Sequence, residues 1–461
     1  MEKINVKSQN LLEGNPFWVI LSFSTFYILG DFLQQLYNAV DSIVLGRFVS
    51  TDALAAIGVA TPIMNLVMNV IIGFTIGSSI VFARWFGKGD NNMLKRSIST
   101  ALIIGISFTI VLSILSIALC KPFLKLLNTP DEIMQDTLIY LYIVFAANIF
   151  TFLYNFYCYA IRAIGNSFTP LVFLIVSTIL NLVLDLLFVL VFKLGIEGAA
   201  IATLIAQAFS AFTIIIYTNK KISEIKLSIK EIAFDKTQAK DILSYSSSVA
   251  LQQTFVYAAR IAVQGLINTF GKTVIAGTNI GEKLNALYQT PLRGYANAST
   301  TYFSQNLGAK KFDRIKGGYK SINIVAFINT AIFMVIGMVF AEPIVKLFVD
   351  SSAIDVIEVG KKSIFYMASG YLFASFIVLN QSLIRSLGKL KVFVILTITT
   401  IMCRVVFSYA FSGLLKEYAI YLAIPVSWVV GGTLNIIFGY LSYKKEVKPF
   451  INIPPLVKDE N

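Results

Sequence analysis

Long apolar stretches recur along nearly the whole chain, and the polar segments between them are short. A membrane-spanning helix needs about 20 mostly apolar residues. Twelve stretches meet this need: residues 16–46, 53–83, 97–120, 133–160, 169–192, 197–218, 242–270, 274–304, 318–341, 357–384, 391–413 and 418–443. Several are longer than a perpendicular helix requires, which predicts tilted or bent helices. The pattern therefore predicts an all-α polytopic membrane protein with twelve transmembrane helices.

A single sizeable polar interruption separates the sixth and seventh spans. Residues 219–241 are rich in Lys and Glu and poor in aromatic residues. We expect this segment to be a cytoplasmic linker. It would join an N-terminal lobe, residues 1–218, to a C-terminal lobe, residues 242–461.

The two halves of the chain resemble each other at a nearly constant offset. Residues 161–165 (IRAIG) match residues 384–388 (IRSLG) 223 positions later, and residues 85–88 (WFGK) match residues 306–309 (NLGA) at an offset of 221. Because each half holds six spans, an even number, both halves have the same orientation. We expect two pseudo-symmetric lobes related by an axis along the membrane normal, with a binding site between them near the midplane.

Composition narrows the class of protein. Of the 461 residues, 56% are hydrophobic and 14% charged, against about 45–50% and about 25% in soluble domains. These values exclude a soluble enzyme and a disordered chain. The chain contains no histidine, which excludes histidine-based metal sites and catalytic triads. The net charge of +13 does not predict nucleic-acid binding, because so apolar a chain offers no large wet surface for a basic groove.

The basic residues predict how the chain crosses the membrane. With the N-terminus in the cytoplasm, the cytoplasmic segments hold 25 Lys and Arg residues and the outer segments hold nine. Cytoplasmic loops of membrane proteins carry such an excess. Both termini are therefore predicted to be cytoplasmic, and the surplus of positive charge is a topology signal.

Apart from charges near the ends of the spans, eight charged residues fall inside the predicted spans. An ionised group at bilayer depth costs at least about 2.5–3.5 kcal/mol unless it faces a cavity or a partner, so these residues are functional candidates. The acidic ones are Asp31, Asp41, Asp185 and Glu282, and the basic ones are Arg260, Lys283, Arg293 and Arg404.

Polar side chains follow one face of several spans. In the first span four of them are three or four positions apart, namely Asp31, Gln34, Asn38 and Asp41; this spacing places them on one helical face. Such a stripe predicts the wall of a water-filled cavity, although amides and hydroxyls alone also suit helix–helix contacts. Further candidates of this kind in the first half are Tyr37, Asn155, Ser177, Asn181, Asp185, Thr203 and Gln207.

The second half carries different chemistry. Gln253 and Arg260 lie on one face of the seventh span, and Glu282 lies on the eighth. At the offset of 223, Arg404 stands where the first half has Asn181. Two interpretations stay open: an arginine neutralises Glu282, or the arginines help to bind an anionic part of a substrate or to gate the cavity.

Four motifs resemble those of the multidrug and toxic compound extrusion (MATE) transporters. Residues 34–47 (QQLYNAVDSIVLGR) and 53–58 (ALAAIG) resemble signatures of the first two helices. Residues 195–203 (GIEGAAIAT) resemble the turn between the fifth and sixth helices, and residues 304–311 (SQNLGAKK) the motif after the eighth. The resemblance is closest to the prokaryotic damage-inducible-F-like branch.

The resemblance implies a V-shaped pair of six-helix lobes and secondary active efflux of lipophilic, often cationic, compounds. Export would be driven by entry of H⁺ or Na⁺, with no other cofactor and no enzymatic reaction. The positions that match the coupling site of this branch are Asp41, Asn181, Asp185 and Thr203, which could also bind Na⁺. We expect the other polar positions to line the substrate cavity: Gln34, Tyr37, Asn38, Asn155, Ser177, Gln207, Gln253, Arg260 and Glu282.

The resemblance also implies partners and location. We expect small-molecule drugs or metabolites as substrates, a monomer in the bilayer, and the cytoplasmic membrane of a bacterium or archaeon.

Three positions depart from related proteins. Phe26 stands where relatives usually have a proline, which makes a proline-dependent bend of the first helix doubtful. Asp31 replaces a common amide and adds a third carboxylate to the first lobe. Gln253 replaces the glutamate of the branch that couples through the second lobe, which argues against a coupling site there.

A mechanism follows as a hypothesis. If Asp41 and Asp185 face each other, they form a coupled pair that we expect to keep one proton near neutral pH. Carboxylates, an amide and a hydroxyl also form an oxygen ligand set that suits a hard cation. Entry of the ion from outside would neutralise the pair, let the first helix shift and lower the affinity for a cationic drug.

A lipid-linked saccharide flippase of the same exporter superfamily is the alternative. Such proteins commonly have fourteen spans and a cationic cavity, and Arg260, Arg293 and Arg404 fit that cavity. Twelve spans and the carboxylates of the first lobe count against it.

Overall fold

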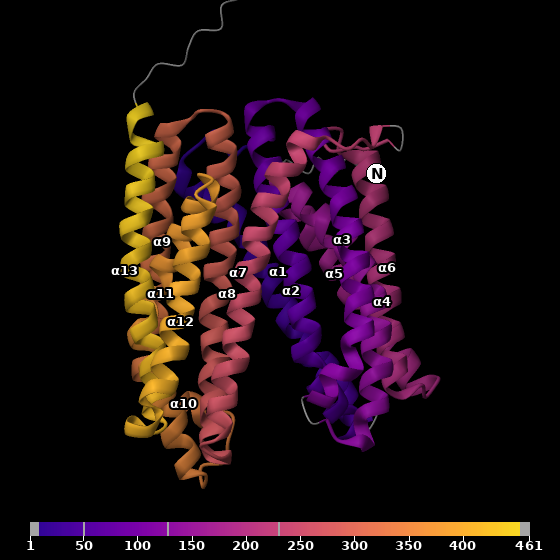
Figure 1. Ribbon diagram of the computed structural model, residues 1–461, viewed down its shortest axis with the longest axis vertical. Helices are drawn as coiled ribbons and strands as arrows, with labels where there is room; N and C mark the ends of the chain where they lie inside the picture. The colour runs from indigo at the N-terminus through magenta and orange to yellow at the C-terminus, as the bar shows by residue number, and fades with distance from the viewer. Residues whose placement is uncertain (1–8, 49–50, 127–128, 229–230, 452–461) are drawn as a thin grey trace, which may run out of the picture. The chain divides into compact units, whose positions relative to one another are not determined.

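The computed structural model describes residues 9–48, 51–126, 129–228 and 231–451, except for the side chains of residues 37–48, 51, 52 and 54. Throughout these ranges the regular elements are helical (Figure 1). They are α1 (Pro16–Phe48), α2 (Thr51–Lys88), α3 (Asn91–Leu126), α4 (Asp131–Ala163), α5 (Phe168–Leu186), η1 (Leu187–Val191), α6 (Gly195–Lys221), α7 (Lys236–Asn268), α8 (Lys272–Gly308), α9 (Phe312–Val339), α10 (Ala341–Lys346), α11 (Ile354–Ser386), α12 (Leu390–Leu415), α13 (Tyr418–Glu446) and η3 (Lys448–Phe450).

The twelve long α-helices coincide with the twelve predicted spans. Ten of the described helices are long and apolar enough to cross a membrane. The other two, α7 and α8, are of similar length but more polar in composition. The chain is therefore a multi-pass membrane protein, and the predicted fold class is confirmed.

Apolar side chains cover the outer faces of several helices. On α3, Val111, Ile114 and Leu119 are each more than half exposed, and on α9 the same holds for Phe327 and Val335. In water such a surface would be unusual for a monomer. Exposing this apolar surface to the acyl chains of a bilayer carries no free-energy penalty, because lipid is as apolar as the side chains.

Contacts divide the helices into two compact groups. The first group comprises residues 51–86 of α2, helices α3–α6, residues 25–48 of α1 and residues 236–257 of α7. The second comprises α8–α13, residues 16–24 of α1, residues 87 and 88 of α2 and residues 258–268 of α7. The domain limits predicted from the sequence stay a prediction.

The two groups repeat the same internal packing. In the first group, α4 packs against α3 and α6, and α6 packs against α5. In the second, α11 packs against α9 and α13, and α13 packs against α12. These are equivalent helices in the predicted repeat, which confirms two pseudo-symmetric sets of helices.

The turns repeat as well as the helices. Gly165 and Gly388, which follow α4 and α11, have φ angles of 91° and 77°. Lys193 and Lys416, which precede α6 and α13, have φ angles of 54° and 51°. Residues other than glycine rarely adopt a positive φ. Positive φ angles recur at the offset of 223, which shows that the two halves share the backbone conformation of these turns.

Helices α2 and α7 approach each other closely within the first group. A Cβ atom built on Gly77 would lie 2.4 Å from the Cα atom of Ser246, and one on Gly73 would lie 2.7 Å from that of Ala250. Ser246 donates to the carbonyl of Phe74 at 2.9 Å. Small residues at membrane helix interfaces permit this kind of backbone contact.

Replacing Gly77 by alanine should therefore destabilise the protein. The new methyl group overlaps the backbone of α7, and overpacking typically costs about 1–3 kcal/mol. The unfolding temperature in detergent should fall for Gly77→Ala. The matched control is Gly58→Ala on the same helix, where a Cβ meets nothing within 4 Å. Equal unfolding temperatures for both variants would contradict the close packing.

Candidate functional site

The buried face of α5 carries three polar side chains. Ser177, Asn181 and Asp185 are 8%, 3% and 1% exposed, while Ile179 and Val183 on the opposite face are more than half exposed. The spacing of four residues aligns the three polar groups along one side of the helix. The structure thus turns the predicted stripe inward and leaves the apolar face outside.

The end of α5 is irregular where the stripe ends. Directly after Leu186 the helix widens into the π-helical turn η1, Leu187–Val191. Such turns occur frequently at functional sites. Here η1 begins two residues after Asp185, so the carboxylate lies at the junction of two helical geometries.

Helix α6 returns beside α5 and brings further polar groups to the same depth. The two helices pack against each other, and the connection between them is short, because α6 begins at Gly195. Val189 packs against Ala199 across the two helices, and Asp185 and Thr203 each lie four residues further from the connection. Thr203 therefore lies near the level of Asp185, and Gln207 near that of Asn181. Gln207 Oε1 is buried without a hydrogen-bond partner.

The polar stripe of α4 is also buried. Asn148 and Thr151 are buried, and Asn155 Nδ2 donates to the carbonyl of Thr151 at 2.9 Å. At the end of the stripe the guanidinium of Arg162 packs over the rings of Tyr27 at 4.3 Å and Tyr159 at 5.3 Å.

Asp31 belongs to this aromatic and cationic cluster. It interacts electrostatically with Tyr159, which in turn contacts Arg162. The third carboxylate of the first lobe therefore lies near an aromatic ring over which Arg162 packs.

Part of the predicted site on α1 lies outside the described residues. The backbone of α1 is helical to Phe48, but the side chains of Tyr37, Asn38 and Asp41 are not among the described ones. Gln34 is exposed. No proline interrupts α1, and Phe26 packs edge-on against Phe168 at 5.4 Å.

The predicted cavity residues of the second half fall into different groups of helices. Gln253, in the part of α7 that belongs to the first group, donates to Asn69 Oδ1 at 3.4 Å. Arg260 and Glu282 belong to the second group, where Arg260 Nη2 lies 3.5 Å from Glu282 Oε2. The structure thus shows the neutralising pair for Arg260.

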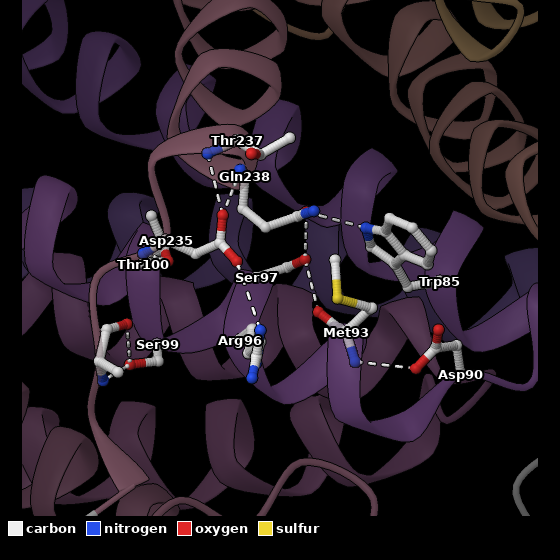
Figure 2. A network of polar contacts seen from close by, with 11 residues as sticks. Trp85, Asp90, Met93, Arg96, Ser97, Ser99, Thr100, Asp235, Thr237 and Gln238 are labelled. Carbon is white, nitrogen blue, oxygen red and sulfur yellow. Dashed lines mark hydrogen bonds and ion pairs between the residues drawn. The ribbon is translucent and has the colours of Figure 1, made fainter.

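Sequence reading missed a polar network that connects the predicted linker to α3 (Figure 2). Asp235 caps α7 by accepting from the backbone N–H groups of Thr237 and Gln238 at 2.9 and 3.1 Å. The buried Gln238 then accepts from Ser97 Oγ at 2.7 Å and from Trp85 Nε1 at 2.9 Å. Asp followed three residues later by Gln is a capping-box signal that could have located this start.

Among the described residues, no group of three or more Cys, Asp or Glu side chains gathers in a way that could hold a metal ion. The oxygen-rich set at the coupling positions includes Asp41, whose side chain lies outside the description. The assignment of Asp41, Asn181, Asp185 and Thr203 to ion coupling stays a prediction.

Comparison with known proteins bears on the family. The chain is 26% identical over 446 residues to the probable multidrug resistance protein YpnP of Bacillus subtilis, covering 96% of this chain and 99% of that protein. It is 22% identical over 370 residues to the multidrug export protein MepA of Staphylococcus aureus, covering 78% and 81%.

Among solved structures, an outward-facing multidrug resistance MATE family transporter of the MOP superfamily shares the fold. Its TM-score is 0.89 at 20% identity, covering 96% of this chain and 99% of that chain. The damage-inducible-F-like branch stays a prediction. A family model described as MatE matches residues 27–187 and again residues 248–410. The two matches coincide with the two repeated halves and cover most of the chain, which therefore belongs to the MatE family.

Proposed function

We propose that this protein is a secondary active transporter that exports lipophilic, often cationic, compounds in exchange for H⁺ or Na⁺. Family membership supports this proposal. So do the relatives of nearly equal length or large overlap, which are described as multidrug resistance and multidrug export proteins.

The observation that carries the proposal is the burial of Asp185. Its side chain is 1% exposed and lies in a helix long and apolar enough to cross the membrane. A carboxylate in such a place is costly unless a proton, a cation or hydrogen-bond donors balance its charge. A buried aspartate at this position is expected if the protein binds and releases a proton or a cation at its carboxylate during transport.

The polar groups around Asp185 suit either coupling ion. Asn181 supplies an amide on the same buried face of α5, and Thr203 supplies a hydroxyl from α6. Together with Asp41 they offer only oxygen ligands to a cation, as Na⁺ prefers, and each carboxylate can instead hold a proton. Coupling then requires only that the ion and the drug prefer different conformations.

The distribution of Lys and Arg residues supports an orientation of the protein in the membrane. We propose that the protein lies in the cytoplasmic membrane of a bacterium or archaeon, works as a monomer and has both termini in the cytoplasm. Twenty-five basic residues would then face the cytoplasm, which is the side favoured for Lys and Arg.

Removing the charge at the coupling positions should abolish energised export. We expect Asp185→Asn and Asp41→Asn to lose drug resistance in an efflux-deficient host by tenfold or more, because an asparagine in place of either carboxylate can neither take up a proton nor balance the charge of a bound cation. Minimum inhibitory concentrations and membrane expression would be measured together.

The matched control is Asp131→Asn, an exposed aspartate in the first turn of α4. It should keep the wild-type resistance. Full resistance in Asp185→Asn, at equal expression, would remove Asp185 from the coupling site.

Imposed ion gradients should identify the coupling ion. In proteoliposomes, export of a cationic dye should accelerate with either an inward H⁺ gradient or an inward Na⁺ gradient. Asp185→Asn should abolish that acceleration. Export that is indifferent to both gradients would contradict antiport.

A further inference from the structure

Three charged side chains of the second group of helices lie close to one another. Arg260 lies on α7, Glu282 on α8 and Arg404 on α12. Helices α7 and α12 are in direct contact, because Tyr409 Oη donates to the carbonyl of Ala262 at 2.8 Å. Arg404 interacts electrostatically with both Glu282 and Arg260.

The charges of this cluster do not cancel. Glu282 Oε2 lies 3.5 Å from Arg260 Nη2 and accepts from Asn285 Nδ2 at 3.2 Å. No carboxylate in the described part of the chain lies within 4.0 Å of Arg404. Two guanidinium groups thus share one carboxylate, which leaves one surplus positive charge. Arg404 stands near the middle of a helix long and apolar enough to cross a membrane, where an uncompensated charge is costly.

Buried neighbours hold Arg404 in place. Its Nε donates to Ser427 Oγ at 3.3 Å, and its guanidinium packs over the ring of Trp428 at 5.4 Å. Trp428 is buried and contacts Tyr371, which stacks on Tyr288 at 3.7 Å. This aromatic stack fixes one face of the guanidinium. Within the described residues, the two terminal nitrogens of Arg404 donate to no protein atom.

The cluster is accessible and has hydrogen-bonding capacity left over. The side chains of Arg260 and Glu282 are 54% and 35% exposed. One turn after Arg404 on the same face of α12, the hydroxyl of Ser408 is buried without a hydrogen-bond partner. A preorganised cation with unused donors, beside an accessible ion pair, is the arrangement expected of an anion-binding site.

We propose that Arg404 and Arg260 bind the carboxylate group of an exported compound. This inference rests on the proposed export function and names a substrate class for it, namely amphiphilic compounds that carry a carboxylate. An incoming carboxylate would accept from the terminal nitrogens of Arg404 and from the donors of Arg260 that Glu282 does not use. Its single negative charge would cancel the surplus positive charge of the cluster.

Glu282 acts in this site as a resident competitor. It forms an ion pair with Arg260 in the absence of substrate, and it limits the net charge of the cluster to one unit. A phosphate dianion would overcompensate that charge, so a monoanionic carboxylate fits better. The planar guanidinium also matches a carboxylate with two parallel hydrogen bonds.

The direct test is equilibrium binding to the purified full-length protein in detergent. The probes are ciprofloxacin, which has a free carboxylate, its methyl ester, and ethidium as a permanent cation. Wild type should bind the acid more tightly than the ester. Arg404→Gln should weaken binding of the acid by about 10- to 100-fold, the usual loss for a charged hydrogen bond, and leave the ester and ethidium within about twofold.

Lys283→Gln is the matched control. It removes one positive charge next to Glu282, but the Lys283 ammonium packs over Phe348 at 4.8 Å and not on the cluster. It should keep the preference for the acid. Equal losses for acid and ester in Arg404→Gln, or a wild type that does not prefer the acid, would overturn the proposal.

A second variant tests the site by a gain. Glu282→Gln removes the competitor from Arg260 and should tighten binding of the acid several-fold, with no change for the ester. A purely structural role of Glu282 predicts no such gain, and an unchanged or weakened affinity for the acid would contradict the proposal.

Transport and binding separate the two proposals. If wild type binds the acid selectively but moves no probe under any gradient, the export function fails and the anion site stands. If ethidium is exported in exchange for an ion while Arg404→Gln binds the acid as wild type does, the export function stands and the anion site fails.

Discussion

An ionised side chain inside a bilayer needs water, an oppositely charged partner or a bound ligand, because acyl chains neither solvate a charge nor form hydrogen bonds with it. This constraint organises the whole chain. Nearly all of the Lys and Arg residues fall outside the predicted spans or near their ends, where water and head groups can solvate them. The few charges placed at depth are therefore informative. Asp185 turns inward on α5, and Arg260 turns toward Glu282. The orientation of each of these side chains goes together with which face of its helix packs inside and which face meets lipid.

Duplication of the scaffold allowed its chemistry to diverge. Turns with positive φ recur at Gly165 and Gly388 and at Lys193 and Lys416, and equivalent helices pack in equivalent pairs. The backbone is thus common to both halves, while the side chains at matched positions differ. Asn181 in the first half corresponds to Arg404 in the second. In the functions proposed above, one half offers oxygen ligands to a cation, and the other offers guanidinium groups to an anion.

Close packing rather than apolar attraction joins α7 to the first group of helices. Lipid is as apolar as leucine, so small residues and local hydrogen bonds must supply the contact. Gly73 and Gly77 let the backbones of α2 and α7 meet. At the cytoplasmic end predicted by the basic residues, Gln238 joins the start of α7 to Ser97 and Trp85 (Figure 2). The seventh helix therefore begins in one group and ends in the other.

The sequence by itself determined the number of spans, the repeat, the family motifs and the inward stripe on α5, because hydrophobic length and helical spacing are local properties of a chain in lipid. It also indicated that Arg260 or Arg404 could neutralise Glu282. Only the tertiary structure decided that Arg260 does so and that Arg404 instead packs on Trp428. It likewise decided that the linker docks on α3 through Gln238. These contacts join residues far apart in sequence, and their geometry depends on how whole helices pack.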